Sequence, residues 1–106
     1  MNAAKIQFSE FAISDILEQS NWYGARSDER LAKRWERAVT STLSRISRVP
    51  NAGSPCRFHA NELGGTRRVP IGGFPKHLIF YQYERGVVFV LRVIHGARDL
   101  ESLFTG

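Results

Sequence analysis

Two stretches in the first half of the chain repeat apolar residues at the three- and four-residue steps of an amphipathic helix. Ser9 can cap the first helix, which is expected to end between Gly24 and Ser27. The second is expected from about Asp28 to Arg48. The predicted buried residues are Ala12, Ile13, Ile16, Leu17, Ser20 and Tyr23 in the first, and Leu31, Trp35, Ala38, Val39, Thr42, Leu43, Ile46 and Val49 in the second.

The pattern changes to that of β-strands in the second half. His77–Glu84 and Val87–Ile94 are rich in Val, Ile, Phe and Tyr. Arg85-Gly86 separates them, which predicts a hairpin. Thr66–Ile71 reads as a strand that ends or bulges at Pro70.

Two short pieces flank these elements. Lys5–Phe8 predicts a short edge strand, and Asp99–Phe104 predicts a closing helical turn. Two helices followed by strands are typical of an α+β fold. We therefore expect one domain over residues 1–106: a short N-terminal strand, a two-helix hairpin, and a three-strand antiparallel meander with the helices packed on one face of the sheet.

The charge of the chain favours an anionic partner. The 106 residues contain 15 Lys and Arg but 10 Asp and Glu, for a net charge of +5. Five arginines follow helical spacing beside the apolar face of the second helix, so they form one narrow flank. The flank fits an acidic partner, and it also fits a simple solvated surface. Its members are Arg30, Arg34, Arg37, Arg45 and Arg48.

Other classes of protein are less consistent with the residues. The single cysteine, Cys56, excludes an internal disulfide, and with His59 it falls short of the four ligands of a zinc site. Neither a metal nor a cofactor is expected. The N-terminus lacks the long apolar segment of a signal peptide, and no stretch is long enough to cross a membrane. A cytoplasmic protein is the expectation.

Several segments together resemble the RelE/ParE superfamily of bacterial toxins from type II toxin–antitoxin pairs. The last of them is the most specific, and it looks more like the ParE branch than the RelE branch. The resemblance covers nearly the whole chain and rests on Asp15-Ile16-Leu17, Pro50 with Gly53, Arg67–Pro70, Phe80-Tyr81 and Leu91–Asp99.

The resemblance implies two possible activities. ParE-like toxins inhibit DNA gyrase, whereas RelE-like toxins cut messenger RNA at the ribosome. Either kind is neutralised by a cognate antitoxin, which we expect to be acidic and encoded by an adjacent gene. Lys76 is the only lysine after Lys33, which departs from the RelE pattern of basic residues on the central strands. The gyrase inhibitor is therefore preferred, with the ribosome-dependent nuclease as the alternative.

A nuclease of the RelE kind would need a base, an acid and cations, but no metal. The residues that could supply them are Arg67, Tyr81, Arg92, His95 and Arg98. Arg92 could instead be a structural cation paired with Asp99 or Glu101, and His95 could be a packing residue.

Two surfaces are predicted from the same residues. The antitoxin is expected to contact Trp22, Tyr23, Arg30, Arg34, Trp35, Arg37 and Arg45, although the three aromatic residues also fit the core. The target is expected to meet Arg67, Arg68, His95 and Arg98. Since Arg67 and Arg68 are neighbours on one strand, at most one of them can lie on the open face of the sheet.

Overall fold

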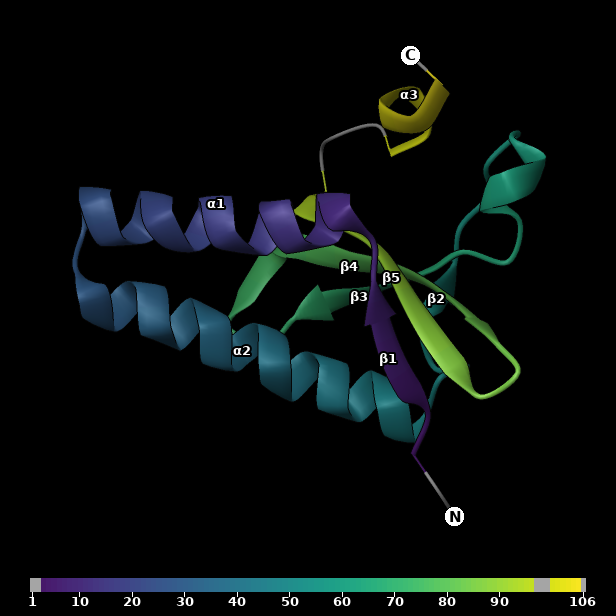
Figure 1. The fold of residues 1–106 in the computed structure, drawn as a ribbon, viewed down its shortest axis with the longest axis horizontal. Helices are drawn as coiled ribbons and strands as arrows, with labels where there is room; N and C mark the ends of the chain where they lie inside the picture. Colours follow the sequence, from purple (N-terminus) through teal and green to yellow (C-terminus); the bar gives the residue numbers. More distant parts are fainter. Residues whose placement is uncertain (1–2, 97–99, 106) are drawn as a thin grey trace.

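A computed structural model of the chain describes residues 3–96 and 100–105. Two helices follow a short strand, and the remaining strands and a short helix come after them (Figure 1). The elements are β1 (Lys5–Phe8), α1 (Glu10–Arg26), α2 (Glu29–Arg48), β2 (Ser54–Pro55), the 3₁₀ helix η1 (Asn61–Leu63), β3 (Arg67–Ile71), β4 (Phe74–Glu84), β5 (Val87–His95) and α3 (Leu100–Thr105).

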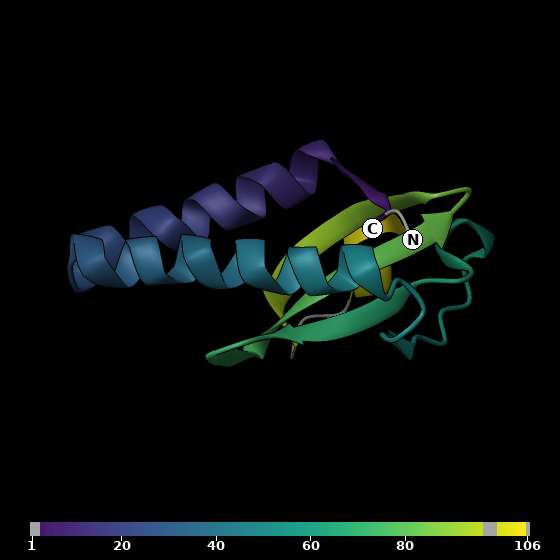
Figure 2. The same cartoon turned by 90° about the horizontal axis from the view of Figure 1, so that it is seen from below.

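Both predicted long helices are confirmed, and each begins at a side-chain cap. The Ser9 hydroxyl accepts the Ala12 N–H at 3.0 Å, and the Asp28 carboxylate accepts the Leu31 N–H at 2.9 Å. Such caps satisfy backbone donors that the first helical turn leaves without partners. The two helices run side by side and project beyond the end of the sheet (Figures 1 and 2).

The predicted buried face of α1 is too wide. Ala12 and Ser20 are buried, but Ile13 and Leu17 are 48% and 57% exposed. The helix packs against α2 on one side and β5 on another, so only a narrow stripe of α1 is covered. At the far end of α2, Val49 was also placed on the buried face, and it is 57% exposed.

The predicted three-strand antiparallel meander is only the central part of a mixed five-stranded sheet. The strand order is β1-β5-β4-β3-β2. The β3–β4–β5 meander is antiparallel, but β1 adds to one edge parallel to β5, with Lys5 opposite Val87. The two-residue strand β2 adds to the other edge. The edge strand predicted at Lys5–Phe8 is confirmed as β1. Its parallel pairing with β5 and the strand β2 were not predicted, because pairing over such a separation leaves no local periodicity.

The hairpin between β4 and β5 is confirmed. Its two-residue turn places Arg85 at φ 52° and Gly86 at φ 79°. Two positive φ values suit the right-handed twist of paired strands, and glycine adopts one of them without a steric penalty.

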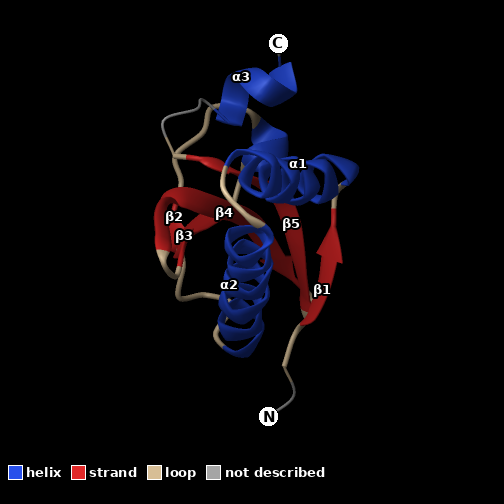
Figure 3. Cartoon of the chain, turned by 90° about the vertical axis from the view of Figure 1, so that its left-hand side faces the viewer, coloured by secondary structure: helices blue, strands red, loops and turns tan. Residues whose placement is uncertain are grey.

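The sheet separates two apolar clusters. The larger lies between the sheet and the helix pair, which covers one face of the sheet, as predicted (Figure 3). On the opposite face, Phe80 and Ile94 pack against Cys56, Phe58 and Leu78.

The predicted closing helix is confirmed as α3. The carboxylate of Glu101 in this helix accepts the backbone N–H of His59 at 3.1 Å. In the described part of the chain, no helix has the length and apolar character needed to span a bilayer.

Candidate partner-binding groove

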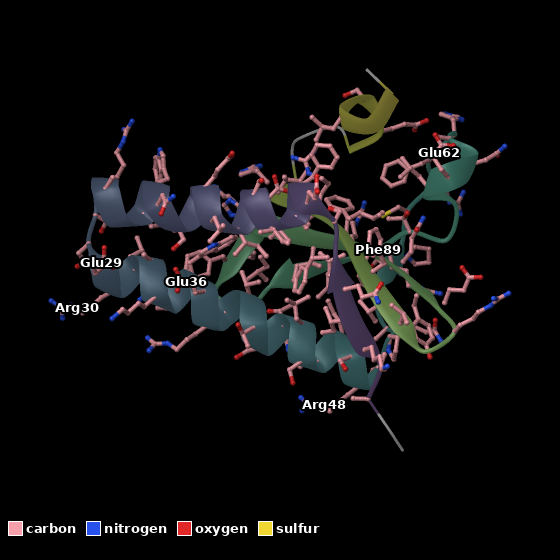
Figure 4. All side chains as sticks on the ribbon, viewed as in Figure 1. Glu29, Arg30, Glu36, Arg48, Glu62 and Phe89 are labelled. Carbon is pink, nitrogen blue, oxygen red and sulfur yellow. The ribbon has the colours of Figure 1, made fainter. Side chains whose placement is uncertain are left out.

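The arginine flank of α2 is exposed along its whole length. Figure 4 shows Arg30 and Arg48 at opposite ends of the helix. Within residues 3–96 and 100–105, no carboxylate lies at ion-pair distance from any of the five flank arginines. The guanidinium of Arg34 lies 6.0 Å from the centroid of the Phe74 ring at the start of β4. The flank therefore borders the sheet and keeps its charge available.

An apolar groove opens where the last turns of α2 approach β3. Its volume is about 460 Å³, which falls in the range of ligand sites. The connector between α2 and β2 contributes lining residues as well. The groove is lined by Arg45, Ile46, Arg48, Val49, Ala52, Gly53, Ser54, Arg68, Val69 and Pro70.

Local sequence explains the shape of the groove. Helix α2 ends at Arg48, and Val49 leaves the helical conformation as its C-cap, with φ −135°. Pro50 follows and cannot continue a helix. Val49 is thus left 57% exposed, and it lines the groove together with Val69.

The rim of the groove is cationic. Arg45 and Arg48 line it from the last turns of α2. Of the described residues that line the groove, none carries a carboxylate. The guanidinium groups of Arg45 and Arg48 beside apolar lining residues suit a ligand that combines carboxylates with apolar side chains.

Arg92 has a different environment. Its guanidinium donates to both carboxylate oxygens of Asp15, each at 2.8 Å, and one of those oxygens also accepts the Val93 N–H at 3.0 Å. The Arg92 and Asp15 side chains are only 11% and 9% exposed. Hydrogen bonding to Asp15 raises the pKa of Arg92 above its ordinary value.

Of the two partners predicted for Arg92, Glu101 is therefore wrong, and Asp99 is not described by the structure. Glu101 instead bonds to the loop at His59 and Ala60, and Asp99 lies outside the described part of the chain. Asp15 pairs with Arg92 instead, because α1 runs along the part of β5 that extends beyond its pairing with β1. There Ser9 also donates to the Leu91 carbonyl at 2.7 Å.

Tyr81 and Arg67, two nuclease candidates, both hold the connector. The Tyr81 hydroxyl donates to the Pro50 carbonyl at 2.7 Å and accepts the Gly53 N–H at 3.1 Å. Arg67 donates to the Gly53 carbonyl at 2.7 Å. Tyr81 is fully buried, and burial raises the pKa of its hydroxyl. Both side chains therefore hold the connector, of which Gly53 lines the groove.

His95 ends β5 opposite His77 of β4. Their ring centroids lie 5.6 Å apart, and both rings border a small hollow that also includes Glu18 and Trp22. Burial, followed by the charge of His95, lowers the pKa of His77. His95 is exposed, whereas Arg98 lies outside the described residues.

The three aromatic antitoxin candidates differ in exposure. Trp35 is fully buried, with its indole N–H donating to the Ile16 carbonyl at 3.1 Å, so the core alternative describes it. Tyr23 is half-buried against Trp35 and Phe74. Trp22 is 51% exposed, with the guanidinium of Arg26 above its ring at 5.3 Å.

The two neighbouring arginines of β3 lie on opposite faces, as the strand geometry predicts. Arg67 is half-buried beside Tyr81, and Arg68 is exposed beside Phe80. Phe80 belongs to the apolar cluster on the face away from the helices, so the Arg68 side chain lies on that face, although the residue also borders the groove.

Comparison with known proteins decides the family. The profile of the ParE toxin of type II toxin–antitoxin systems, parDE, matches residues 6–100 of the chain. The chain belongs to this ParE toxin family. This match confirms the resemblance to the RelE/ParE superfamily and its ParE-like branch, and it identifies the chain as a type II toxin.

Solved structures share the fold of this toxin. The chromosomal ParDE toxin–antitoxin system from P. aeruginosa aligns with a TM-score of 0.71 at 12% identity, over 88% of this chain and 96% of that one. The toxin–antitoxin complex RelBE2 from Mycobacterium tuberculosis aligns with a TM-score of 0.60 at 22% identity, over 88% of this chain and 98% of that one. No curated protein sequence matches the toxin.

Proposed function

We propose that this ParE-family toxin acts in the cytoplasm as a non-enzymatic inhibitor of DNA gyrase and is held inactive by a cognate, acidic antitoxin. The non-enzymatic part of this proposal rests on the positions of the nuclease candidate residues, which lie apart from one another. RNA cleavage through a 2′-hydroxyl needs a base, an acid and a cation gathered around one phosphate.

Most of the nuclease candidate residues are engaged in hydrogen bonds within the toxin, in different parts of the molecule. Tyr81 and Arg67 are hydrogen-bonded to the connector on the helix-covered side of the sheet. Arg92 is held by Asp15 at the β5 edge. This leaves His95 as the exposed candidate among the described residues. Such an arrangement supports a toxin that works by binding.

The second candidate function is ribosome-dependent cleavage of messenger RNA, and exposed His95 is the observation that favours it. His95 lies beside His77 at the edge of the sheet, where a substrate could reach it. If the imidazole moves a proton in the reaction, His95→Ala will lower cleavage by roughly 10²-fold while leaving the fold intact.

Regulated expression separates the two functions. The toxin is induced without its antitoxin, and DNA-damage signalling is scored against arrest of translation. Purified toxin is then added to a gyrase supercoiling assay and to a translation assay with intact messenger RNA. Inhibition of gyrase supports the proposal, whereas messenger RNA cut in a ribosome-dependent way contradicts it.

The antitoxin part of the proposal rests on charge and on the solved relatives, which are themselves parts of toxin–antitoxin systems. The flank residues Arg34 and Arg37 are exposed without an acidic partner among the described residues. Changing both to Glu is expected to weaken antitoxin binding more at low salt than at high salt, because salt screens exposed charges. Titration calorimetry at two ionic strengths measures this; a loss that is independent of salt contradicts it.

A further inference from the structure

We propose that the cleft enclosed by the start of β1, the end of α2 and the β4–β5 turn binds an unpaired strand of DNA. The volume of this cleft is about 810 Å³, which falls in the range of ligand sites. It shares Arg48 with the groove at β3, and its other lining residues are different. The inference rests on the proposed function only for the choice of DNA over RNA, because gyrase acts on DNA.

Three cations from distant parts of the chain line the cleft. Lys5 comes from β1, Arg48 is the last residue of α2, and Arg85 lies in the β4–β5 turn. Lys5 and Arg48 make no ion pair within the described residues. Arg85 lies 3.8 Å from Glu84, but both side chains are more than 80% exposed, so this pair is weak. Three available cations around one concave surface suit a polyanion such as a nucleic-acid backbone.

Hydrogen bonds hold the three cation-bearing segments together. The Ala4 N–H donates to the Ser47 carbonyl at 2.9 Å, and the Ser47 hydroxyl donates back to the Ala4 carbonyl at 2.6 Å. The Lys5 N–H donates to the Gly86 carbonyl at 2.9 Å. The start of β1 is therefore fixed between the end of α2 and the turn (Figure 1). The backbone of the cleft is already ordered, which lowers the entropic cost of binding.

An exposed aromatic ring in the cleft provides a surface for one base. Tyr83 lines the cleft and is 38% exposed. It pairs with the core residue Val88 on the helix-covered face of the sheet, so its neighbour Glu84 points to the opposite face. The described lining of the cleft contains no carboxylate that would repel a phosphate. Bases of a single strand stack on aromatic side chains, and the paired bases of a duplex are not available for this contact.

The experiment uses the full-length toxin and a fluorescently labelled oligothymidylate of about 12 nucleotides, with binding followed by anisotropy at several salt concentrations. We expect the affinity to fall with salt, by a logarithmic slope of about 0.7 for each phosphate contact. A duplex of the same length and a glutamate peptide of equal charge should each bind at least about fivefold more weakly, since neither stacks a base on Tyr83. Oligouridylate is expected to bind no more tightly than the DNA.

Two charge-matched variants locate the phosphate contacts. Lys5→Gln with Arg85→Gln should weaken binding at least about tenfold and reduce the salt slope by about 1.4, the value for two lost contacts. Arg30→Gln with Lys33→Gln also removes one lysine and one arginine, near the other end of α2, and should leave the affinity within about twofold (Figure 4). Thermal unfolding of both variants confirms that they are folded.

A second pair of variants tests the stacked base. Tyr83→Leu keeps an apolar side chain but removes the ring, and it should weaken binding of the oligothymidylate at least about fivefold. Tyr83→Phe keeps the ring and should bind within about twofold of the wild type. A purely structural role of Tyr83 would not distinguish a single strand from a duplex, so both variants are also measured with the duplex, whose binding should be unchanged.

The inference is overturned if the oligothymidylate does not bind, if the duplex or the glutamate peptide binds as tightly, if the two charge variants weaken binding equally, or if Tyr83→Leu has no effect. Oligouridylate that binds at least about tenfold more tightly overturns the assignment to DNA. Inhibition of gyrase is scored separately, in the supercoiling assay. A toxin that inhibits gyrase without binding the oligonucleotide defeats only the cleft, whereas one that binds it and leaves gyrase active defeats only the proposed function.

Discussion

Two arginine environments of this toxin differ in how the charge is balanced. Arg92 is balanced within the chain, by a carboxylate that makes two hydrogen bonds to it. Arg45 and Arg48 border an apolar groove whose described lining residues include no carboxylate. The first arrangement joins α1 to β5, and the second leaves charge and apolar surface uncovered together. The comparison teaches that arginine content alone says little about binding, and that the pairing of each arginine carries the information.

The largest expected effect comes from breaking the Asp15–Arg92 pair. Asp15→Ala leaves a nearly buried guanidinium and the Val93 N–H without their acceptor, and removal of one member of such a pair costs about 3–5 kcal/mol of unfolding free energy. Urea unfolding measures the change. The control is Glu84→Gln, since Glu84 and Arg85 form an ion pair whose side chains are 82% and 91% exposed. A similar loss in both variants would contradict the distinction.

The connector below the groove should give the next largest effect. A Cβ at Gly53 would lie 2.5 Å from the Tyr81 hydroxyl oxygen, so Gly53→Ala is expected to destabilise the toxin by about 1–3 kcal/mol. Adding Tyr81→Phe removes the clashing oxygen, and the double variant should therefore lose less than the sum of the two single losses. Additive losses in chemical unfolding would show that the two residues do not meet.

His77 should make stability depend on pH. Its folded-state pKa is lowered by burial and by the charge of His95, so the unfolded chain binds the proton more readily. Stability is therefore complete above the unfolded pKa of about 6.5 and falls as the pH drops from there through the folded pKa. His95, Lys76, Asp15 and Glu18 line the hollows around the ring.

The measurement is the difference between wild-type toxin and His77→Gln in thermal unfolding between about pH 7 and pH 5. The variant should lose less stability over this interval than the wild type. Equal slopes for the two proteins would rule out the His77 contribution, because every other titratable residue is the same in both.

The smallest effect is expected on the arginine flank. Arg34→Gln with Arg37→Gln removes neighbouring like charges from an exposed helix face, and such pairs alter helix stability by about 0.2–0.5 kcal/mol each. The variant should be slightly more stable than wild type at low salt and equal to it at high salt. A clear destabilisation would mean that the flank contributes to the fold.

The elements predicted correctly are those whose signals are local. Helix α2 carries its cap at Asp28, its apolar stripe and its stop at Pro50 within one stretch of sequence. The Arg85-Gly86 turn likewise fixes the central hairpin by itself. Patterns of this kind depend on residues a few positions apart, so the sequence alone was sufficient.

The missed features depend on distant residues. The parallel pairing of β1 with β5 joins Lys5 to Val87, and the partner of Arg92 is 77 positions away at Asp15. Such pairs leave no periodic pattern in the sequence, because they depend on how the helix layer packs against the sheet. The sequence predicted an arginine flank beside apolar surface, but the place of the groove against β3 was not predicted, because the approach of β3 to the end of α2 is equally non-local.

Gly53 lines the groove and also donates its N–H to Tyr81 in the centre of the sheet. Any ligand bound there would rest on a segment that is bonded to the core. Such a ligand would favour the folded connector, so the occupied toxin should resist proteolytic cleavage at the connector better than the free toxin does.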